Sequence, residues 1–351
     1  MLGMSVVHYI AHFRSKNDEA RLQGLLAGCQ KLLFWATVAG SLAAIVLTKP
    51  LGHFFHFPRS SLMLAVLICG MVGWWSGFGM SLCQGMTWFK RLAVIGVAGV
   101  GLRLLFAWLM TKPFPTAEFA LSSTTVALLV NFVLFYWWKD IFRHPAQRIS
   151  PWNREFIQFL MVTGATVSGM YFFGTGDSLV ANKYFTKGAL DAYQTAVRLG
   201  RAITATVLPL LMVTFTSRSG SKEGAAKTDQ RILLSLYAVG LACGAVVLIL
   251  FRGLLVRVIL GRPNEEAARM IVPFSITMVL IGLNQAVGMW SLADRTFKIA
   301  LLYGALGLAY WTTLLRFGRT PEALLTIMPI GAGVSFCVLC GCWLAGRRRK
   351  A

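Results

Sequence analysis

The chain has 351 residues, of which 56% are apolar and 13% charged, whereas soluble domains carry about 25% charged residues. A mean hydropathy of +0.65 excludes a soluble globular fold, and the net charge of +21 falls mainly in the polar joints between apolar runs. Outside those runs, no basic face with interleaved aromatic residues remains. We therefore expect anionic lipid headgroups rather than nucleic acid as the partner of these charges.

The first 13 residues, MLGMSVVHYIAHF, are apolar but too short to cross a bilayer, and Arg14 ends them. They lack the positive start and the small-residue cleavage site of a signal peptide. We interpret them as the end of a helix. On this hypothesis the chain either starts late or has lost its first hairpin.

Ten apolar runs follow, bounded by charges or proline, and each is long enough to predict a membrane-spanning helix. They cover residues 32–48, 61–83, 92–111, 119–138, 156–174, 188–213, 232–251, 270–291, 299–315 and 323–345. The long joint at 139–155 contains two prolines and divides the spans four before and six after. This predicts an all-α membrane protein with two lobes.

The predicted N-terminal lobe covers residues 1–140, with four full spans and a partial helix at 1–13. A cytoplasmic linker at 141–155, a six-span lobe at 156–346 and a basic tail at 347–351 complete the chain. If the lobes were matched repeats of six helices, the first would lack two.

Lysine and arginine are enriched in cytoplasmic loops, so their distribution predicts orientation. Of the 34 such residues, 20 fall on the side of the C-terminal tail and 11 on the other. The bias predicts a multi-pass inner-membrane protein with a cytoplasmic C-terminus. One cluster opposes it, made of Arg252, Arg257, Arg262 and Arg269.

Ionisable side chains within spans are costly and are the default functional candidates. Arg103 lies near the middle of the span 92–111, where it is a candidate for facing a polar cavity. Arg198 and Arg201 are three residues apart, so one helical face carries both, and Gly200 allows a neighbour or a ligand to approach. The two guanidinium groups either bind a phosphate or pair with Asp191 or lipid headgroups.

Asp177 follows two glycines in GTGDSLVANKYF and stands shortly before Lys183. Its carboxylate could pair with an arginine or bind a coupling cation, and the alternative is a helix N-cap at the start of a short reentrant segment.

Other patterns predict no chemistry. Cys337 and Cys340 have half of a zinc-site spacing in an apolar run, with no second pair or histidine. His8 and His12 lack an accompanying carboxylate ligand, and the glycines at 96, 99 and 101 favour close helix packing rather than nucleotide binding. We expect no catalytic residues, no metal and no cofactor.

Three segments resemble the polysaccharide and O-antigen flippases of the multidrug/oligosaccharidyl-lipid/polysaccharide exporter superfamily. SLCQGMTWFKRLAVIGVAGVGLRLLFAWLM (81–110) is similar to the turn between that family's fourth and fifth helices. GTGDSLVANKYFTKGALDAYQTAVRLGRAI (174–203) is similar to its aspartate, short turn and eighth-helix opening. VLPLLMVTFTSRSG (207–220) resembles its cytoplasmic exit, although the proline stands earlier here.

The resemblance implies an incomplete twelve-helix carrier that flips an undecaprenyl-pyrophosphate-linked oligosaccharide by alternating access, for surface polysaccharide or lipopolysaccharide biosynthesis. Arg103, Arg198, Arg201, Asp177 and Lys183 are the residues expected to bind this substrate. Glycan polymerase or export proteins would be its partners.

Three alternatives stay open at this stage. An ion-coupled drug exporter of the same superfamily would need more cavity carboxylates than this sequence offers. A sugar ligase or polymerase would need a large external loop or a clustered acid/base pair. An inactive truncated remnant would account for the short first helix.

Overall fold

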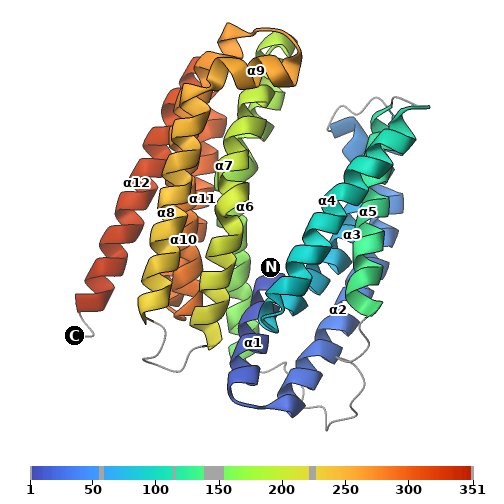
Figure 1. The fold of residues 1–351 in the computed structure, drawn as a ribbon, viewed down its shortest axis with the longest axis vertical. Helices are drawn as coiled ribbons and strands as arrows, with labels where there is room; N and C mark the ends of the chain where they lie inside the picture. The colour runs from blue at the N-terminus through green and yellow to red at the C-terminus, as the bar shows by residue number, and fades with distance from the viewer. Residues whose placement is uncertain (1, 55–58, 114–115, 138–153, 221–226, 349–351) are drawn as a thin grey trace. The chain divides into compact units, whose positions relative to one another are not determined.

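A computed structural model describes residues 2–54, 59–113, 116–137, 154–220 and 227–348, and the regular structure in these residues is entirely helical (Figure 1). The helices are α1 (Leu2–Ser15), α2 (Glu19–Phe54), α3 (Ser60–Gly85), α4 (Phe89–Thr111), α5 (Ala117–Trp137), α6 (Arg154–Tyr184), α7 (Lys187–Gly220), α8 (Lys227–Leu250), α9 (Arg252–Leu260), α10 (Glu265–Ala293), α11 (Phe297–Phe317) and α12 (Pro321–Arg348).

Ten of these helices, all except α1 and α9, are long and apolar enough to cross a membrane. The predicted all-α fold with about ten spans is therefore confirmed. Most of the predicted linker, residues 141–153, lies outside the described residues, as do residues 349–351 of the predicted tail.

Several helices extend well beyond the apolar runs that predicted them. Helix α2 begins at Glu19 rather than near residue 32, so most of the segment before the first predicted span is helical as well. Asp18 precedes it, and its Oδ1 accepts a hydrogen bond from the Arg21 amide at 3.1 Å, as a capping residue does. The negative charge of Glu19 in the first turn also interacts favourably with the positive end of the helix dipole. Hydropathy marks the membrane-embedded part of such a helix and not its ends.

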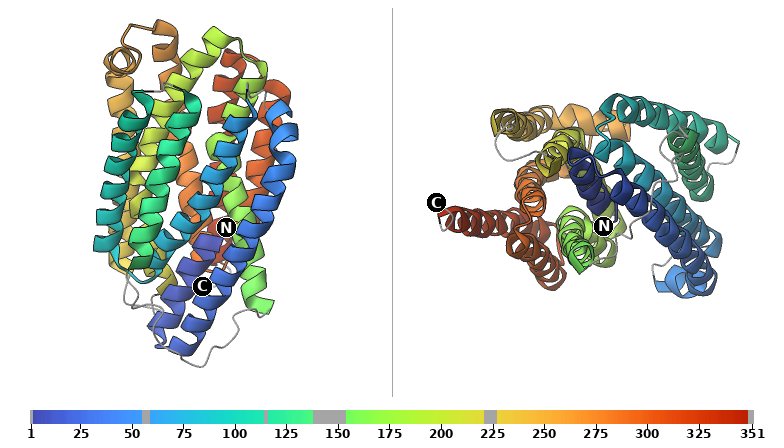
Figure 2. Two further views of the ribbon diagram at one scale, coloured as in Figure 1. Left: turned by 90° about the vertical axis from the view of Figure 1, so that its right-hand side faces the viewer. Right: turned by 90° about the horizontal axis from the view of Figure 1, so that it is seen from below.

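The chain divides into two compact units, Leu2–Phe156 and Ile157–Ala351. In both, the long helices run side by side, whereas α9 lies across the end of its unit (Figures 1 and 2). Within the N-terminal unit, glycines allow close contacts between helices. A Cβ on Gly85 would meet the side chain of Ile10 at 2.8 Å, and one on Gly79 would meet Phe135 at 2.7 Å. Such contacts are typical of helices that associate in a membrane.

The expected role of the glycines in α4 is confirmed at one position. A Cβ on Gly99 would collide with Asn131 of α5, whereas Cβ atoms on Gly96 and Gly101 would meet nothing within 4 Å. Gly99 therefore lies in a helix contact and the other two do not.

In the C-terminal unit, α6 and α11 approach through backbone atoms. A Cβ on Gly307 would lie 2.7 Å from the Gly169 Cα, and one on Gly169 would lie 3.0 Å from the Gly304 Cα. Any side chain at Gly307 would force the two helices apart. This contact holds α6, which carries Asp177, against the rest of its unit.

The two units repeat one arrangement of five helices. Helices α1 to α5 correspond in order to α7, α8, α10, α11 and α12, because every pair that packs in the first set also packs in the second. The α3–α4 and α10–α11 turns match in detail: Thr87 and Arg295 have φ angles of 57° and 55°. Each is followed by an amide that bonds to a carbonyl five residues earlier, at 2.8 Å. The Schellman-type ending supplies partners for the last helical carbonyls.

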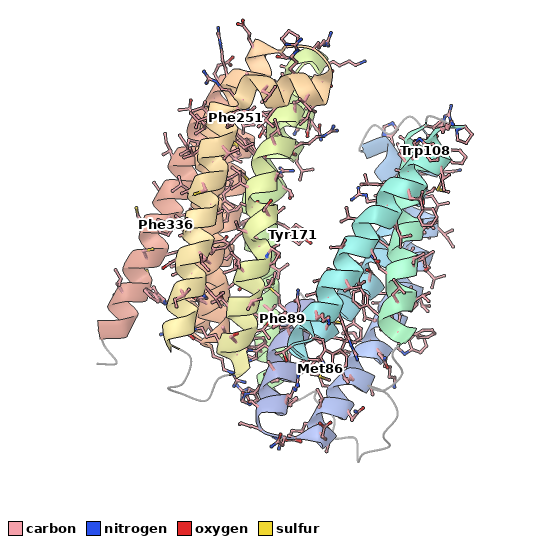
Figure 3. The ribbon with its side chains drawn as sticks, viewed as in Figure 1. Met86, Phe89, Trp108, Tyr171, Phe251 and Phe336 are labelled. Carbon is pink, nitrogen blue, oxygen red and sulfur yellow. The ribbon has the colours of Figure 1, made fainter. Side chains whose placement is uncertain are left out.

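An arginine contacts each of these matching turns. Arg14 donates to the Met86 carbonyl oxygen and to the Thr87 hydroxyl, the latter at 3.0 Å. Arg218, at the end of the corresponding α7, donates through Nε and Nη2 to both carboxylate oxygens of Asp294. Figure 3 labels Met86 at the first of these turns. The correspondence between the two units therefore extends to the arginine side chains that contact these turns.

Candidate functional site

The C-terminal unit contains a buried polar cluster centred on Asp177, whose side chain is fully buried. Asp177 is the only acidic residue in the buried class among the described residues. The Tyr193 hydroxyl donates to its Oδ2 at 2.6 Å, and Arg201 Nη2 donates to its Oδ1 at 2.7 Å. Both carboxylate oxygens therefore have a partner, as a buried charge requires.

Arg201 is held in position but keeps donors to spare. Its Nη2 also donates to the Ser178 hydroxyl at 2.9 Å, while its buried Nε has no hydrogen-bond partner in the described part of the chain. The side chain is 29% exposed. Because a guanidinium group presents five donors in a fixed fork, Arg201 can bind an anion while Asp177 holds it.

Aromatic packing fixes the tyrosine that supports this pair. The Tyr193 ring makes edge contacts with Phe185 and Phe274, with ring centroids 5.4 and 6.0 Å apart. A Cβ on Gly200 would collide with the same Phe274 ring. Of the two expectations for Gly200, the approach of a neighbouring helix is therefore confirmed. The glycine brings α10 against α7 at the level of the cluster.

Polar side chains follow one face of α7 from its start to Arg201. Asp191, Gln194, Arg198 and Arg201 are spaced at intervals of three and four residues, which places them on one face of a helix. Asp191 and Arg198 are exposed, and the other two are half-buried. At 1.5 Å per residue the 34-residue α7 is about 51 Å long, and Arg201 lies about 21 Å from its start. The face therefore reaches roughly the middle of the helix.

An exposed arginine on such a helix is costly to leave against lipid, by about 2.5–3.5 kcal/mol at the centre of a span. Arg198 forms no ion pair within the described residues. Water or polar protein surface is the environment that its charge favours. The neighbouring α6 also exposes Tyr171 and Thr175, and Figure 3 shows Tyr171 projecting away from the bundle of its own unit.

Of the five residues expected to bind substrate, the structure brings two into contact. Asp177 and Arg201 form the buried pair, and Arg198 lies on the exposed face nearby. Lys183 is exposed at the end of α6, with its Nζ 5.2 Å from the centre of the Tyr184 ring. Arg103 belongs to the other unit and is described by itself.

Arg103 is exposed on α4 of the N-terminal unit. It shares a helical face with Gly96, seven residues earlier, where a Cβ would meet nothing within 4 Å. The most exposed apolar residues of α4, Val97 and Leu104, are displaced around the helix from this face. Arg103 therefore lies at the edge of the exposed apolar surface of α4.

The structure contradicts two of the alternatives that the sequence left open. Asp177 does not cap a helix at a reentrant segment, because α6 continues unbroken to Tyr184 and only residues 185–186 separate it from α7. Arg201 does not pair with Asp191, because it points to the Asp177 carboxylate on α6 instead.

Tyr193, Ser178 and Gln194 were not among the residues predicted from the sequence. The spacing that joins Gln194 to Arg198 and Arg201 was a readable signal for one of them. Tyr193 had no such signal, since its role depends on α6 and α7 packing against each other. No group of three or more histidine, cysteine or acidic side chains that could hold a metal occurs in the ranges the structure describes.

No family model matches this sequence, and no curated relative matches it. Solved structures do match over 99% of the chain. One is a MATE protein in the bent conformation, at 13% identity, a TM-score of 0.71 and 82% coverage of that chain. Another is the outward-facing form of a multidrug resistance MATE family transporter of the MOP superfamily, at 12% identity, a TM-score of 0.69 and 83% coverage.

A third is a MOP superfamily transporter from Pyrococcus furiosus, at 13% identity, a TM-score of 0.68 and 83% coverage of that chain. Its description reports a binding pocket of reverse polarity and suggests a different function. At these identities the likeness shows the fold alone. The chain has the helical exporter fold of these proteins, as its sequence predicted.

Proposed function

We propose that this chain is a membrane transporter that flips an undecaprenyl-pyrophosphate-linked oligosaccharide across the inner membrane by alternating access, for surface polysaccharide or lipopolysaccharide biosynthesis. The supporting observation is the charge of the polar face of α7. Arg198 and Arg201, the two residues of this face nearest the middle of the helix, are cationic. The buried carboxylate of Asp177 forms an ion pair with Arg201. A pyrophosphate suits paired guanidinium groups, whereas a cationic drug would be repelled.

In this proposal Arg201 contacts the substrate phosphate and Asp177 is a positioning residue. The carboxylate holds one end of the guanidinium group, so the remaining donors are oriented before the substrate arrives. Arg198 adds a second positive charge one turn away. Movement then depends on binding and gating, and no covalent bond is made or broken.

The competing proposal is an ion-coupled exporter of cationic drugs with the same fold. Its support is the multidrug resistance transporter among the similar structures. A buried carboxylate with a neighbouring tyrosine is also a suitable coupling group. The charge balance of α7 opposes this alternative.

The test is transport by the full chain reconstituted in liposomes, with two probes. One is a fluorescent polyprenyl-pyrophosphate disaccharide, followed by loss of surface quenching, and the other is ethidium. The proposal expects movement of the first probe and a loss of at least ten-fold in Arg198→Gln. Because it retains the positive charge, Arg198→Lys should keep part of the activity.

Lys298→Gln removes an exposed charge of the same unit, outside the α7 face and outside the predicted site, and serves as the matched control. Transport of ethidium alone, or equal loss in Arg198→Gln and Lys298→Gln, would overturn the assignment of an anionic lipid substrate.

A further inference from the structure

The short helix α9 differs from every other helix in the C-terminal unit. It follows α8 after the single residue Phe251 and lies across the end of the bundle (Figure 1). It contacts α7, α8 and α10, and Val256 is fully buried on the side facing them. Gly261, with a φ of 67°, ends it in a left-handed conformation that glycine adopts without strain. The bend and the cap together fix α9 across the spans.

The side of α9 opposite Val256 is apolar and uncovered. Leu254 and Val258, four residues apart and therefore on one helical face, are 60% and 71% exposed. Phe251, at the bend before α9, is 52% exposed and is labelled in Figure 3. Three large apolar side chains thus form one surface at the end of the unit.

Arginines flank this apolar surface. Arg252 and Arg257 lie on α9 and Arg262 follows it, and all three are exposed. No acidic residue occurs between residues 251 and 263, and these arginines form no ion pair within the described residues. The next acids, Glu265 and Glu266, belong to α10, where Glu265 lies 3.7 Å from Arg269. The surface therefore carries three uncompensated positive charges.

We propose that α9 lies in the plane of the membrane–water interface and binds anionic phospholipids. Phe251, Leu254 and Val258 enter the boundary between headgroups and acyl chains, and the arginines bind the headgroup phosphates. An amphipathic helix with a basic flank and a bulky apolar face has the composition of an interfacial helix. Anionic lipids supply the charge that complements the arginines.

This role also accounts for the placement of the arginines. The segment that carries them lies on the side of the membrane where the lysine and arginine distribution predicts few basic residues. Arginines that serve an interfacial helix rather than a cytoplasmic loop are expected to depart from this distribution.

The first test places the photocrosslinker p-benzoyl-phenylalanine at Leu254 in the full chain. Liposomes contain phosphatidylcholine and phosphatidylglycerol in a 3:1 ratio, and mass spectrometry identifies each adduct. We expect phosphatidylglycerol adducts enriched several-fold over its share of the lipid. The control position is Val334 of α12, which is 58% exposed in a span without nearby charges and should label lipids in proportion.

Crosslinking to a second copy of the chain would overturn the proposal. Lipid adducts in simple proportion at Leu254, or none while Val334 reacts, would overturn it as well.

The second test compares two triple variants that lose the same charge. Arg252→Gln, Arg257→Gln and Arg262→Gln remove the arginines at α9. Lys298→Gln, Arg316→Gln and Arg319→Gln remove three exposed charges elsewhere in the unit. Each basic residue near an anionic headgroup contributes roughly a five-fold gain in binding. The first triple should therefore weaken phosphatidylglycerol binding in native mass spectrometry by on the order of 100-fold.

The control triple should change that binding by less than about five-fold, the contribution of one such residue. An equal loss in both triples would mean that total charge, rather than α9, attracts the lipid.

Discussion

The Asp177–Arg201 pair predicts an asymmetric response to mutation. Asp177 is fully buried, whereas the Arg201 side chain is 29% exposed. Removing the arginine, in Arg201→Gln, leaves a buried carboxylate without its counter-charge. Breaking a buried pair in this way costs about 3–5 kcal/mol. Removing the carboxylate, in Asp177→Asn, leaves an arginine that can turn toward water, so we expect a smaller cost of about 1–2 kcal/mol.

The double variant should recover much of the loss, because neither charge is then left alone. The expected coupling free energy between the two sites is about 2–3 kcal/mol, well above the few tenths typical of independent sites. Tyr193→Phe provides a further check, since it removes one hydrogen bond to the same carboxylate and should cost about 1.5–3 kcal/mol.

The measurement is the free energy of unfolding of the full chain in mixed micelles, from titration with sodium dodecyl sulfate. Arg201→Gln should lower the midpoint more than Asp177→Asn does. Equal costs with no coupling would mean that Arg201 is not the counter-charge of Asp177, and the reasoning would fail.

Two further predictions concern packing and the braced turn. Gly307→Ala should lower the free energy of unfolding by about 1–3 kcal/mol in the same titration, because the new Cβ would overlap the α6 backbone. At Gly174 a Cβ would meet nothing within 4 Å, so Gly174→Ala should be neutral or stabilising by up to about 1 kcal/mol. Equal effects would contradict the close α6–α11 contact. Arg218→Gln removes a bidentate ion pair with Asp294 and should lower the free energy of unfolding by about 1–2 kcal/mol. Arg269→Gln removes an ion pair that is almost fully exposed and should change the free energy of unfolding by less than about 0.5 kcal/mol. A result the other way round would show that the turn does not depend on Arg218.

The spans were predictable because hydropathy reports the solvent around a segment. The helix ends were not, since polar residues such as those at 19–31 and 175–184 are good enough helix formers to continue a helix beyond the apolar run. The same limitation hid α9, whose nine residues lie in a segment read as a joint. Its two arginines made it resemble a loop.

The candidate site was predictable residue by residue but not as a contact. The energetic cost of placing an ionisable side chain within a span singled out Asp177 and Arg201. The sequence left open whether the two side chains are in contact. Their contact depends on α6 and α7 forming a hairpin with a two-residue connection, which brings residues 24 apart within 2.7 Å. Tyr193 could not be identified beforehand, because an isolated tyrosine in an apolar helix has many possible partners.

The pair also changes what a transport experiment can distinguish. In an exporter of cations, Arg201 competes with the substrate for Asp177, so Arg201→Gln should free the carboxylate and increase ethidium transport. In a flippase for a pyrophosphate-linked lipid, the same variant removes a substrate-binding group and should reduce flipping at least ten-fold. The double variant Asp177→Asn with Arg201→Gln separates charge from stability, since it relieves the unpaired carboxylate but restores no positive charge. Recovery of flipping in the double variant would therefore show that Arg201 serves the fold alone, and continued loss in a stably folded protein would place its guanidinium group on the substrate.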